Sequence, residues 1–583
     1  MRATMLLLPC TLLLLLPCAA APGPRLAWSA APQAPAGRGA QDPAAAAQAA
    51  AFAADCAAFR GWLDDYRVGA FRMVKEGKLD DAAQATVDGH CQKLAAWNSL
   101  EAAKLLFDAA AVEPKPPGAT AATDLVDFHR EVQPWRVQTT ACNHLRTMTG
   151  DGILPWLLQQ LQAPGLRTGK KSAEQRNAMA VLRVLGGHPS KEAQLELLRA
   201  CRTMPIELRV IAVNAMAKEP TVELVPTLVE LLRDAEPNLR IAAINAIGQA
   251  LQPHVDESLG KAPTGELLAL RDAANTRLED LLVRDQIWQV RSAAAYALAI
   301  QKCKTAIPAL IRGLEAELGR KKDPWAMDVR LHKLLEGLTG QSVARGSVAP
   351  WQDFWAKEGG KFTVRLASEA GQPKPKSDRY QKFFDLEVES DRVLFVVDFS
   401  GSMEEPITLQ TKTTAAPPNQ ATTKSAIVIA ELKKLIMSLP DGALVNLVVF
   451  SDGVRIWRAD AGRPALVKVN DEVRDDLLGN FLDSLRPSGP TNLYGALDAA
   501  LDFGGRGLHD KYYAAGFDTL YVITDGAPTV GAVIDKDEIR RRVREANQLR
   551  RIAIHCITFG NQNDTSFLKP LAEENGGRHI HVE

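Results

Sequence analysis

The chain has 583 residues, 46% of them hydrophobic, which is enough for more than one domain with its own core. Lysine plus arginine and aspartate plus glutamate are equal at 69 each, so no overall charge attracts nucleic acid or an anionic membrane. Any partner must therefore be recognised by a particular surface site and not by overall charge, and we expect no nucleic-acid partner.

The amino terminus has the pattern of a secretory signal. Arg2 precedes an apolar stretch that is densest at Leu12–Leu16, and small residues follow at Ala19–Ala21. Two prolines interrupt this stretch, and it is shorter than the roughly 20 residues that a membrane span needs. We therefore predict a signal peptide over residues 1–21 and an exported protein, either secreted, periplasmic or at the cell surface.

Two membrane-attached alternatives remain open. An uncleaved signal would act as an anchor. The segment Leu15-Leu16-Pro17-Cys18 resembles a bacterial lipobox, although proline before the cysteine departs from the usual small residue. A lipoprotein anchored through Cys18 would lie at a membrane surface. We expect membrane contact in these two cases alone.

Residues 22–50 are rich in Ala, Pro and Gly and carry few large apolar side chains. Burial of such a segment cannot offset the entropy lost on ordering, so we predict a disordered tether. A helical region is predicted over residues 51–120, where Cys56 and Cys91 could form a disulfide in an exported helical hairpin. Its apolar stripe comprises Phe59, Trp62, Leu63, Tyr66 and Phe71.

Residues 121–356 contain a repeat in which an arginine precedes a small, apolar helical run. The clear copies begin at Arg176, Arg209, Arg240 and Arg291. Successive copies are 33, 31 and 51 residues apart. Paired helices at this period predict an α-solenoid, and the pattern resembles HEAT or HEAT-like repeats. The longer last step implies an insertion, which Gln252–Gly265 would accommodate.

We interpret the arginines and the alanines that follow them as packing and inter-repeat hydrogen bonding rather than a site. The concave surface of the solenoid is a possible second protein-binding face, as its resemblance implies. Trp351, Phe354 and Trp355 are expected to cover the apolar end of the solenoid, or else to form an aromatic binding patch. Residues 357–383 are the predicted linker, and its length suggests that the two lobes can reorient.

The C-terminal part is organised around the segment Asp391–Ser402. Five apolar residues, Val393–Val397, run without polar interruption, which is typical of a strand buried on both faces. The strand ends in Asp398, Ser400 and Ser402, whose oxygens can converge in the loop that leaves it. One carboxylate and two hydroxyls suit a hard divalent cation such as Mg²⁺.

Two later segments end in matching groups. Leu520–Thr524 is a second apolar strand followed by Asp525, and the turn-rich loop Pro487–Asn492 places Thr491 before a helical run. In an open parallel sheet such loops gather at the carboxyl edge of the strands, where ligands bind. Helices and strands alternate over residues 384–583, which predicts a doubly wound, Rossmann-like α/β domain.

This pattern resembles the metal-ion-dependent adhesion site of the von Willebrand factor type A domain. The five signature positions are present in order at Asp398, Ser400, Ser402, Thr491 and Asp525. The resemblance implies that the three hydroxyl residues bind Mg²⁺ or Mn²⁺, while the two aspartates act directly or through water. It also implies an open coordination position for a carboxylate of a partner protein. The alternative is a fold that keeps these residues without using the metal.

The segment Glu404–Thr423 is an unusual Thr-, Ala- and Pro-rich insertion directly after the metal motif. It could contact the partner or cover the site, or it could be a disordered loop. After the first strand we expect helices at Lys424–Leu439, Val473–Leu485, Leu493–Leu501, Asp537–Leu549 and Ser566–Glu574, and strands at Val445–Phe450, Leu520–Thr524, Ile552–Phe559 and near His579.

Two classes of function fit this sequence. The first is a non-enzymatic, exported adhesion module that binds a protein partner through a divalent metal and is displayed on a solenoid scaffold. The second is a metal-assisted enzyme. The chain has no HExxH, Walker A or GxSxG motif and no clear general base near the site, so we predict that it is not an enzyme. An intermediate possibility is an assembly subunit of an enzyme complex, as similar domains are in chelatase machines.

Overall fold

The computed structural model describes residues 43–74, 81–112, 134–163, 166, 173–217, 220–320, 325–364, 382–384, 386–408, 421–460, 462–502, 515–531, 533–559 and 565–582. The described residues fall in two compact units that are divided between Ala51 and Phe52. The predicted signal peptide, with Cys18, lies outside the described residues. So does the predicted tether up to residue 42.

The last part of the predicted tether is helical, so the prediction of disorder was wrong for residues 43–50. Helix α1 covers Pro43–Val74 and begins in an alanine-rich segment. Alanine has the most favourable helix propensity of all residues, which competes with the low apolar content on which the prediction relied. Within the described residues, no helix is both long and apolar enough to span a bilayer.

The helices that follow belong to the second unit. They are α2 (Asp81–Trp97), α3 (Leu100–Ala110), α5 (Pro134–Arg146), α6 (Ile153–Gln160), α7 (Ala173–Leu185), α8 (Lys191–Thr203), α9 (Ile206–Met216), η2 (Val222–Leu224), α10 (Val225–Leu231), α11 (Pro237–Val255), η3 (Glu257–Leu259), α12 (Gly265–Arg284), α13 (Trp288–Ile300), α14 (Ala306–Gly319), α15 (Met327–Thr339) and α16 (Ala349–Glu358).

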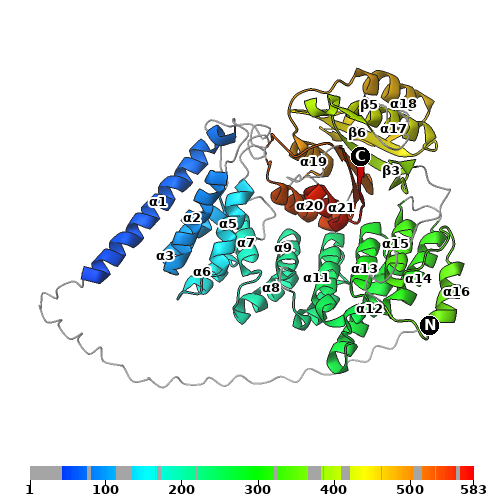
Figure 1. The fold of residues 1–583 in the computed structure, drawn as a ribbon. Coiled ribbons are helices and arrows are strands. Elements are labelled where there is room, and N and C mark those ends of the chain that lie inside the picture. Colours follow the sequence, from blue (N-terminus) through cyan, green and yellow to red (C-terminus); the bar gives the residue numbers. More distant parts are fainter. Residues whose placement is uncertain are drawn as a thin grey trace, which may run out of the picture. The chain divides into compact units, whose positions relative to one another are not determined.

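These helices form the predicted α-solenoid (Figure 1). Helices α5, α7, α9, α11, α13 and α15 each contact the next and make one layer. Helices α10, α12, α14 and α16 make a second layer, and α10, α12 and α14 each also pack on the following helix of the first layer. Each helical repeat therefore buries its apolar face against the neighbouring repeats, as a repeat architecture requires.

The repeated arginines connect the layers, which confirms the structural interpretation of the pattern. Three of the four reach a carboxylate in or just after the next helix of the second layer, and the pairs are Arg209 with Asp234, Arg240 with Asp285, and Arg291 with Glu317. Arg240 donates through Nε and Nη2 at 3.0 and 3.1 Å. Arg291 is fully buried, and its Nη1 also donates to the carbonyl oxygens of Asp285 and Gln286.

The longer repeat differs in part from the prediction. Helix α11 continues through Pro253 to Val255 and does not end at Gln252. The Asp256 side chain then accepts a hydrogen bond from the backbone of Ser258, which begins the short turn η3. Much of the extra length of this repeat lies in its second-layer helix α12. This helix has 20 residues, whereas α10, the corresponding helix of the preceding repeat, has 7. Pro253 lies inside this helix α11, two residues before its end, although a proline there removes one backbone hydrogen bond.

The disulfide that Cys56 and Cys91 could form is not present. Both are buried free thiols in the helical core. Burial raises the pKa of Cys91 to about 12, because apolar surroundings disfavour the thiolate.

The end of the solenoid is covered as expected. Trp351 is fully buried and its Nε1–H donates to His332 Nδ1 at 2.9 Å. Phe354 and Trp355 are partly buried against the same core. These three aromatic residues therefore serve packing.

The sheet domain contains β1 (Lys382–Phe383), β2 (Leu386–Glu387), β3 (Arg392–Asp398), η4 (Gly401–Glu404), β4 (Pro406–Thr408), β5 (Ala421–Thr423), α17 (Lys424–Ser438), β6 (Leu444–Phe450), β7 (Val454–Ile456), β8 (Ala459–Asp460), β9 (Arg463–Pro464), β10 (Val467–Lys468), α18 (Asp471–Asp475), η5 (Asp476–Phe481), η6 (Leu482–Ser484), α19 (Leu493–Leu501), β11 (Thr519–Thr524), α20 (Lys536–Arg550), β12 (Ala553–Phe559), α21 (Thr565–Glu574) and β13 (His579–Val582).

The strands β6, β3, β11, β12 and β13 lie in that order and are parallel, with β10 and β7 added antiparallel to β6. Strand β3 is thus flanked by β6 and β11, and its residues from Val393 onward are buried. Apolar clusters on both faces of the sheet complete a doubly wound α/β domain. The predicted fold class, a helical solenoid followed by this domain, is confirmed.

Three local features were not foreseen. Strand β1 places residues 382–383, predicted as linker, in the domain, where Phe383 is fully buried against Phe395 and Tyr521. The predicted helix Val473–Leu485 begins at Asp471 and contains an α-helical, a π-helical and a 3₁₀ turn. The insertion after the metal motif begins and ends as the paired strands β4 and β5. Residues 409–420 between them lie outside the described residues.

Solenoid helix α15 contacts the sheet domain through Arg330. Its guanidinium donates to the carbonyl oxygens of Asp518 at 2.8 Å and Arg551 at 2.6 Å. The backbone N–H of Ala326 donates to the Asp518 carboxylate at 2.9 Å, and the Ser390 hydroxyl donates to it at 2.5 Å. Asp518 is fully buried, so these contacts satisfy a carboxylate that water does not reach.

A second group of charges lies nearby. Glu389 pairs with Lys333 and with Arg345, whose Nη1 is 2.7 Å away. Burial alone would raise the pKa of Glu389, but the two cations hold it below its ordinary value. Separating these elements would break these ion pairs, so a reorientation of the two lobes, as the linker length suggests, would have to overcome them.

We expect Arg330→Ala to lower the free energy of unfolding by about 2–3 kcal/mol, because two buried carbonyl oxygens lose charge-assisted donors. Arg312→Ala is the matched control, since Arg312 forms an exposed pair with Glu279 and such pairs contribute about 0–1 kcal/mol. Thermal unfolding of the two variants measures the difference. Equal shifts would show that the Arg330 contacts do not hold the two parts together.

Candidate metal site

The segment after β3 forms a turn at the carboxyl edge of the sheet. Asp398 is fully buried; its Oδ1 accepts the backbone N–H of Ser400 at 2.7 Å, and its Oδ2 accepts the Thr524 hydroxyl at 2.6 Å. The backbone N–H of Phe399 donates to the Phe450 carbonyl oxygen at 2.7 Å. The ends of β6 and β11 thus fix the turn from both sides, as their position beside β3 requires.

Four of the five predicted residues are brought together here. The Ser400 and Ser402 hydroxyl oxygens are 3.1 Å apart, and the Ser402 hydroxyl donates to Asp525 Oδ1 at 2.8 Å. Asp398 is joined to this group through Ser400 and through Thr524, the neighbour of Asp525. Residues 123 positions apart in the chain therefore share one hydrogen-bonded cluster.

Thr491, the fifth residue, lies in the adjoining loop and is buried. Its backbone N–H donates to the Thr529 hydroxyl at 2.8 Å, and its carbonyl oxygen accepts the Thr529 N–H at 2.9 Å. The same loop contacts the serine turn, because the Gly401 N–H donates to the Gly489 carbonyl oxygen at 2.8 Å. Gly489 has φ +73°, a left-handed conformation that favours glycine. Backbone contacts therefore hold the Thr491 loop against the serine turn.

Lys424 also belongs to the site, although no sequence motif marks it. It is the first residue of α17, and its Nζ donates to Asp525 Oδ2 and Glu405 Oε2, both at 2.8 Å, and to the Ser402 carbonyl oxygen at 3.3 Å. The spacing to these partners follows no motif. The one available signal was the position of Lys424 at the end of the insertion that follows the serines.

The electrostatics of the two aspartates differ. Burial raises the pKa of Asp398 to about 6, and the charge of Asp525 adds to this effect, while hydrogen bonds from Thr524 and Ser400 oppose it. Burial would lower the pKa of Lys424, but its hydrogen bonds and ion pairs with Asp525 and Glu405 raise it above its ordinary value. Asp398 therefore receives hydrogen bonds from neutral groups, whereas Asp525 faces a cation.

The donor set fits a hard divalent cation. It combines two carboxylates with serine and threonine hydroxyls, which are oxygen ligands of the kind that Mg²⁺ and Mn²⁺ prefer. Among the described residues, no group of three or more His, Cys, Asp or Glu side chains could hold a metal ion. The present cluster differs from such a group because most of its donors are hydroxyls.

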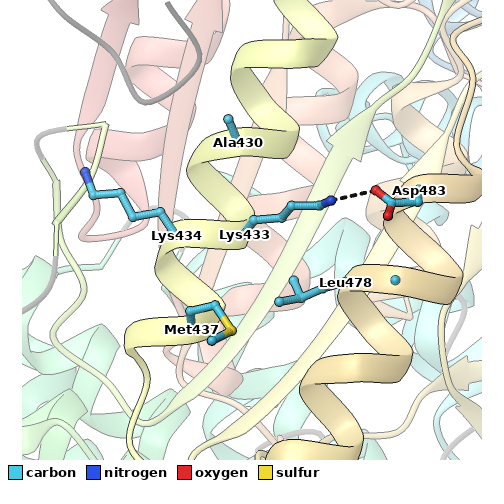
Figure 2. A pocket seen from close by; sticks show the side chains of 7 residues that line it. Ala430, Lys433, Lys434, Met437, Leu478 and Asp483 are labelled. Carbon is cyan, nitrogen blue, oxygen red and sulfur yellow. Dashed lines mark hydrogen bonds and ion pairs between the residues drawn. The ribbon is translucent and has the colours of Figure 1, made fainter.

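A shallow hollow lies elsewhere on the domain, between α17 and η5 (Figure 2). Ala430, Met437 and Leu478 line it, and an ion pair between Lys433 and Asp483 crosses it at 2.6 Å. None of the five predicted metal-site residues lines this hollow.

Comparisons with known proteins identify two parts of the chain. Residues 391–580 match the von Willebrand factor type A domain, and residues 224–253 match the HEAT repeat. The first match contains all five predicted site residues and supports a role in protein interaction. The chain thus contains a von Willebrand factor type A domain and HEAT-type repeats, which confirms both resemblances.

Curated relatives share a limited part of the chain. This chain is 27% identical over 187 residues to inter-alpha-trypsin inhibitor heavy chain H1 of Sus scrofa. It is 30% identical over 194 residues to inter-alpha-trypsin inhibitor heavy chain H4 of Homo sapiens. These alignments cover 32% and 33% of this chain and 18% of each relative. A solved von Willebrand factor type A structure from Catenulispora acidiphila is similar over 34% of this chain and 40% of its own, with 18% identity and a TM-score of 0.25.

The raised pKa of Asp398 predicts a pH dependence of stability in metal-free buffer. Because its native pKa of about 6 exceeds its ordinary value of 3.8, protonation favours the folded state, and this stabilisation is lost as pH rises through 6. At pH 7.5 the buried charge costs about 3 kcal/mol, a shift of about two units at 1.36 kcal/mol each. Asp398→Asn should remove this cost.

Thermal unfolding in EDTA at pH 7.5 and pH 5 measures the effect. We expect Asp398→Asn to be more stable relative to the unmodified chain at pH 7.5 than at pH 5, by roughly 1–2 kcal/mol. Asp452→Asn, which changes an exposed carboxylate on the same edge of the sheet, is the control for the substitution itself. A difference for Asp398→Asn that is independent of pH would contradict the account.

Proposed function

We propose that the von Willebrand factor type A domain of this chain binds Mg²⁺ or Mn²⁺ and uses the ion to coordinate a carboxylate of a partner protein. Asp398, Ser400, Ser402, Thr491 and Asp525 would hold the ion. The observation that carries the proposal is the fully buried Asp398 carboxylate, which receives its hydrogen bonds from neutral groups at the edge where the serine hydroxyls gather.

The charge of the site supports an acidic partner group. Two carboxylates just neutralise a divalent ion, so the bound ion remains attractive to a further anionic oxygen. Mg²⁺ usually keeps several coordination positions for water or substrate oxygens and is seldom enclosed by protein ligands alone. The metal would supply a coordination bond to the partner, and the protein would position its hydroxyls and exclude competing ligands.

The solenoid would act as the scaffold and as a possible second binding surface. Helices α11, α13 and α15 already contact the sheet domain of the same chain through Asn245, Tyr296 and Arg330. A second partner would therefore use solenoid surface outside these contacts. A metal-assisted enzyme or an assembly subunit of an enzyme complex is the alternative, and turnover by the metal-loaded chain would favour it.

Calorimetric titration of Mg²⁺ and Mn²⁺ into the full chain tests the proposed metal site. We expect saturable binding at one site, and at least a tenfold loss of affinity in Asp525→Asn because one of two site carboxylates loses its charge. Asp452→Asn, the matched control at the same edge of the sheet, should bind nearly as well as the unmodified chain. Absence of binding by the unmodified chain, or equal losses in both variants, would reject the site.

Export is proposed from the sequence of residues 1–21, and a lipid anchor at Cys18 remains the alternative. Cell fractionation of a bacterial host should find the full chain outside the cytoplasm and a variant lacking residues 2–21 inside it. Cys18→Ala separates the alternatives, because it would release a lipid-anchored chain from membranes and leave a secreted one unchanged. Retention of the full chain in the cytoplasm would contradict export.

A further inference from the structure

Lys424 occupies a position that its charge makes unusual. Its side chain is 8% exposed, and its ammonium group contacts the Asp525 carboxylate, which is 1% exposed. A buried ion pair of this kind recovers the cost of desolvating both charges when its geometry is good and further hydrogen bonds satisfy the remaining donors. Here the Ser402 carbonyl oxygen and the Glu405 carboxylate accept the other hydrogen bonds of Lys424.

The two oxygens of Asp525 have different neighbours. Oδ1 accepts the hydrogen bond of the Ser402 hydroxyl, on the side of the proposed metal, while Oδ2 accepts that of Lys424. The Asp525 carboxylate thus faces the proposed metal position with Oδ1 and the Lys424 ammonium group with Oδ2. A divalent ion on the first side and an ammonium group on the second would repel each other across it.

Lys424 also joins the metal site to the insertion. Glu405 immediately precedes β4 and Lys424 immediately follows β5, and these strands pair with Pro406 opposite Thr423. The Lys424 backbone N–H donates to the Glu405 carbonyl oxygen at 3.3 Å, and the Thr423 hydroxyl caps α17. The base of the hairpin formed by β4 and β5 is therefore tied to Asp525 through a single ammonium group.

We infer that Lys424 is a built-in cation that stabilises the metal-free site, lowers its affinity for divalent ions, and fixes the base of the β4–β5 hairpin beside the position of the partner. This inference rests on the proposed metal site. It makes Lys424 a positioning residue, and it assigns to Glu405 the opposite effect on metal affinity, because the Glu405 charge offsets that of Lys424.

The substitution Lys424→Met removes the charge and keeps most of the side-chain volume. In EDTA, we expect a lower unfolding temperature, because the buried Asp525 loses its counter-charge. In calorimetry, we expect Mg²⁺ to bind about tenfold more tightly, because a cation next to Asp525 no longer competes with the metal. Lys433→Met, the same substitution at an ion-paired lysine of α17, is the control and should change neither measurement beyond a small stability shift.

Glu405→Gln separates an electrostatic role from a purely structural one. It leaves the charge of Lys424 without one of its two counter-charges, so we expect Mg²⁺ to bind about twofold more weakly, in the opposite direction to Lys424→Met. Glu405 is largely exposed, with 66% of its side chain accessible, and its effect should be correspondingly small. Two changes in the same direction would overturn the inference.

The outcomes distinguish this inference from the proposed function. If Lys424→Met binds Mg²⁺ and the unmodified chain does not, Lys424 replaces the metal in the native chain and the proposed function fails. If neither binds, the proposed function fails and the inferred effect of Lys424 on metal affinity fails with it, and a lower unfolding temperature of Lys424→Met in EDTA would then show a structural ion pair only. If both bind with equal affinity, the inference is wrong and the metal site stands.

Discussion

The burial of two carboxylates at one edge of a parallel sheet is the constraint on which the candidate site depends. Strand β3 lies between β6 and β11, so its end is surrounded by the loops that follow both neighbours. Asp398 is consequently removed from water, and burial raises its pKa to about 6. A carboxylate in this position must be protonated, be paired with a cation or remain costly.

The two buried aspartates are stabilised by different kinds of neighbours. Asp525 has Lys424 as a counter-charge, whereas Asp398 accepts hydrogen bonds from Ser400 and Thr524. The proposed divalent ion would neutralise Asp398 and share Asp525 with Lys424. In this account metal binding relieves a cost that the fold creates, which is a physical reason for the hydroxyls to gather there.

Strand β11 connects this edge with the solenoid. Asp518, just before the strand, is held by Arg330 and Ala326, while Asp525, just after it, belongs to the candidate site. Six residues, Thr519–Thr524, separate the two aspartates, and all six are buried. The solenoid therefore supports the strand at the end opposite to the candidate metal site, and the candidate site does not depend on the same contacts.

Much of this organisation could be predicted from sequence because it rests on local patterns. The uninterrupted apolar runs located β3 and β11, and the arginine repeat located the solenoid helices. The contacts of Lys424 and Arg330 could not be predicted, since their partners are 101 and 188 residues away and no motif spacing relates them. The helical start at Pro43 and the free thiol of Cys56 were missed because composition alone does not decide between helix and tether, or between pairing and burial.

The most direct test of the central claim is the location of Mn²⁺ by anomalous diffraction from crystals of the full chain. We expect one strong peak at bonding distance from the Ser400 and Ser402 hydroxyls, with Thr491 and the two aspartates around it, and its loss in Asp398→Asn. A peak elsewhere on the domain, or an unchanged peak in the variant, would contradict the claim that the buried carboxylate creates the metal site.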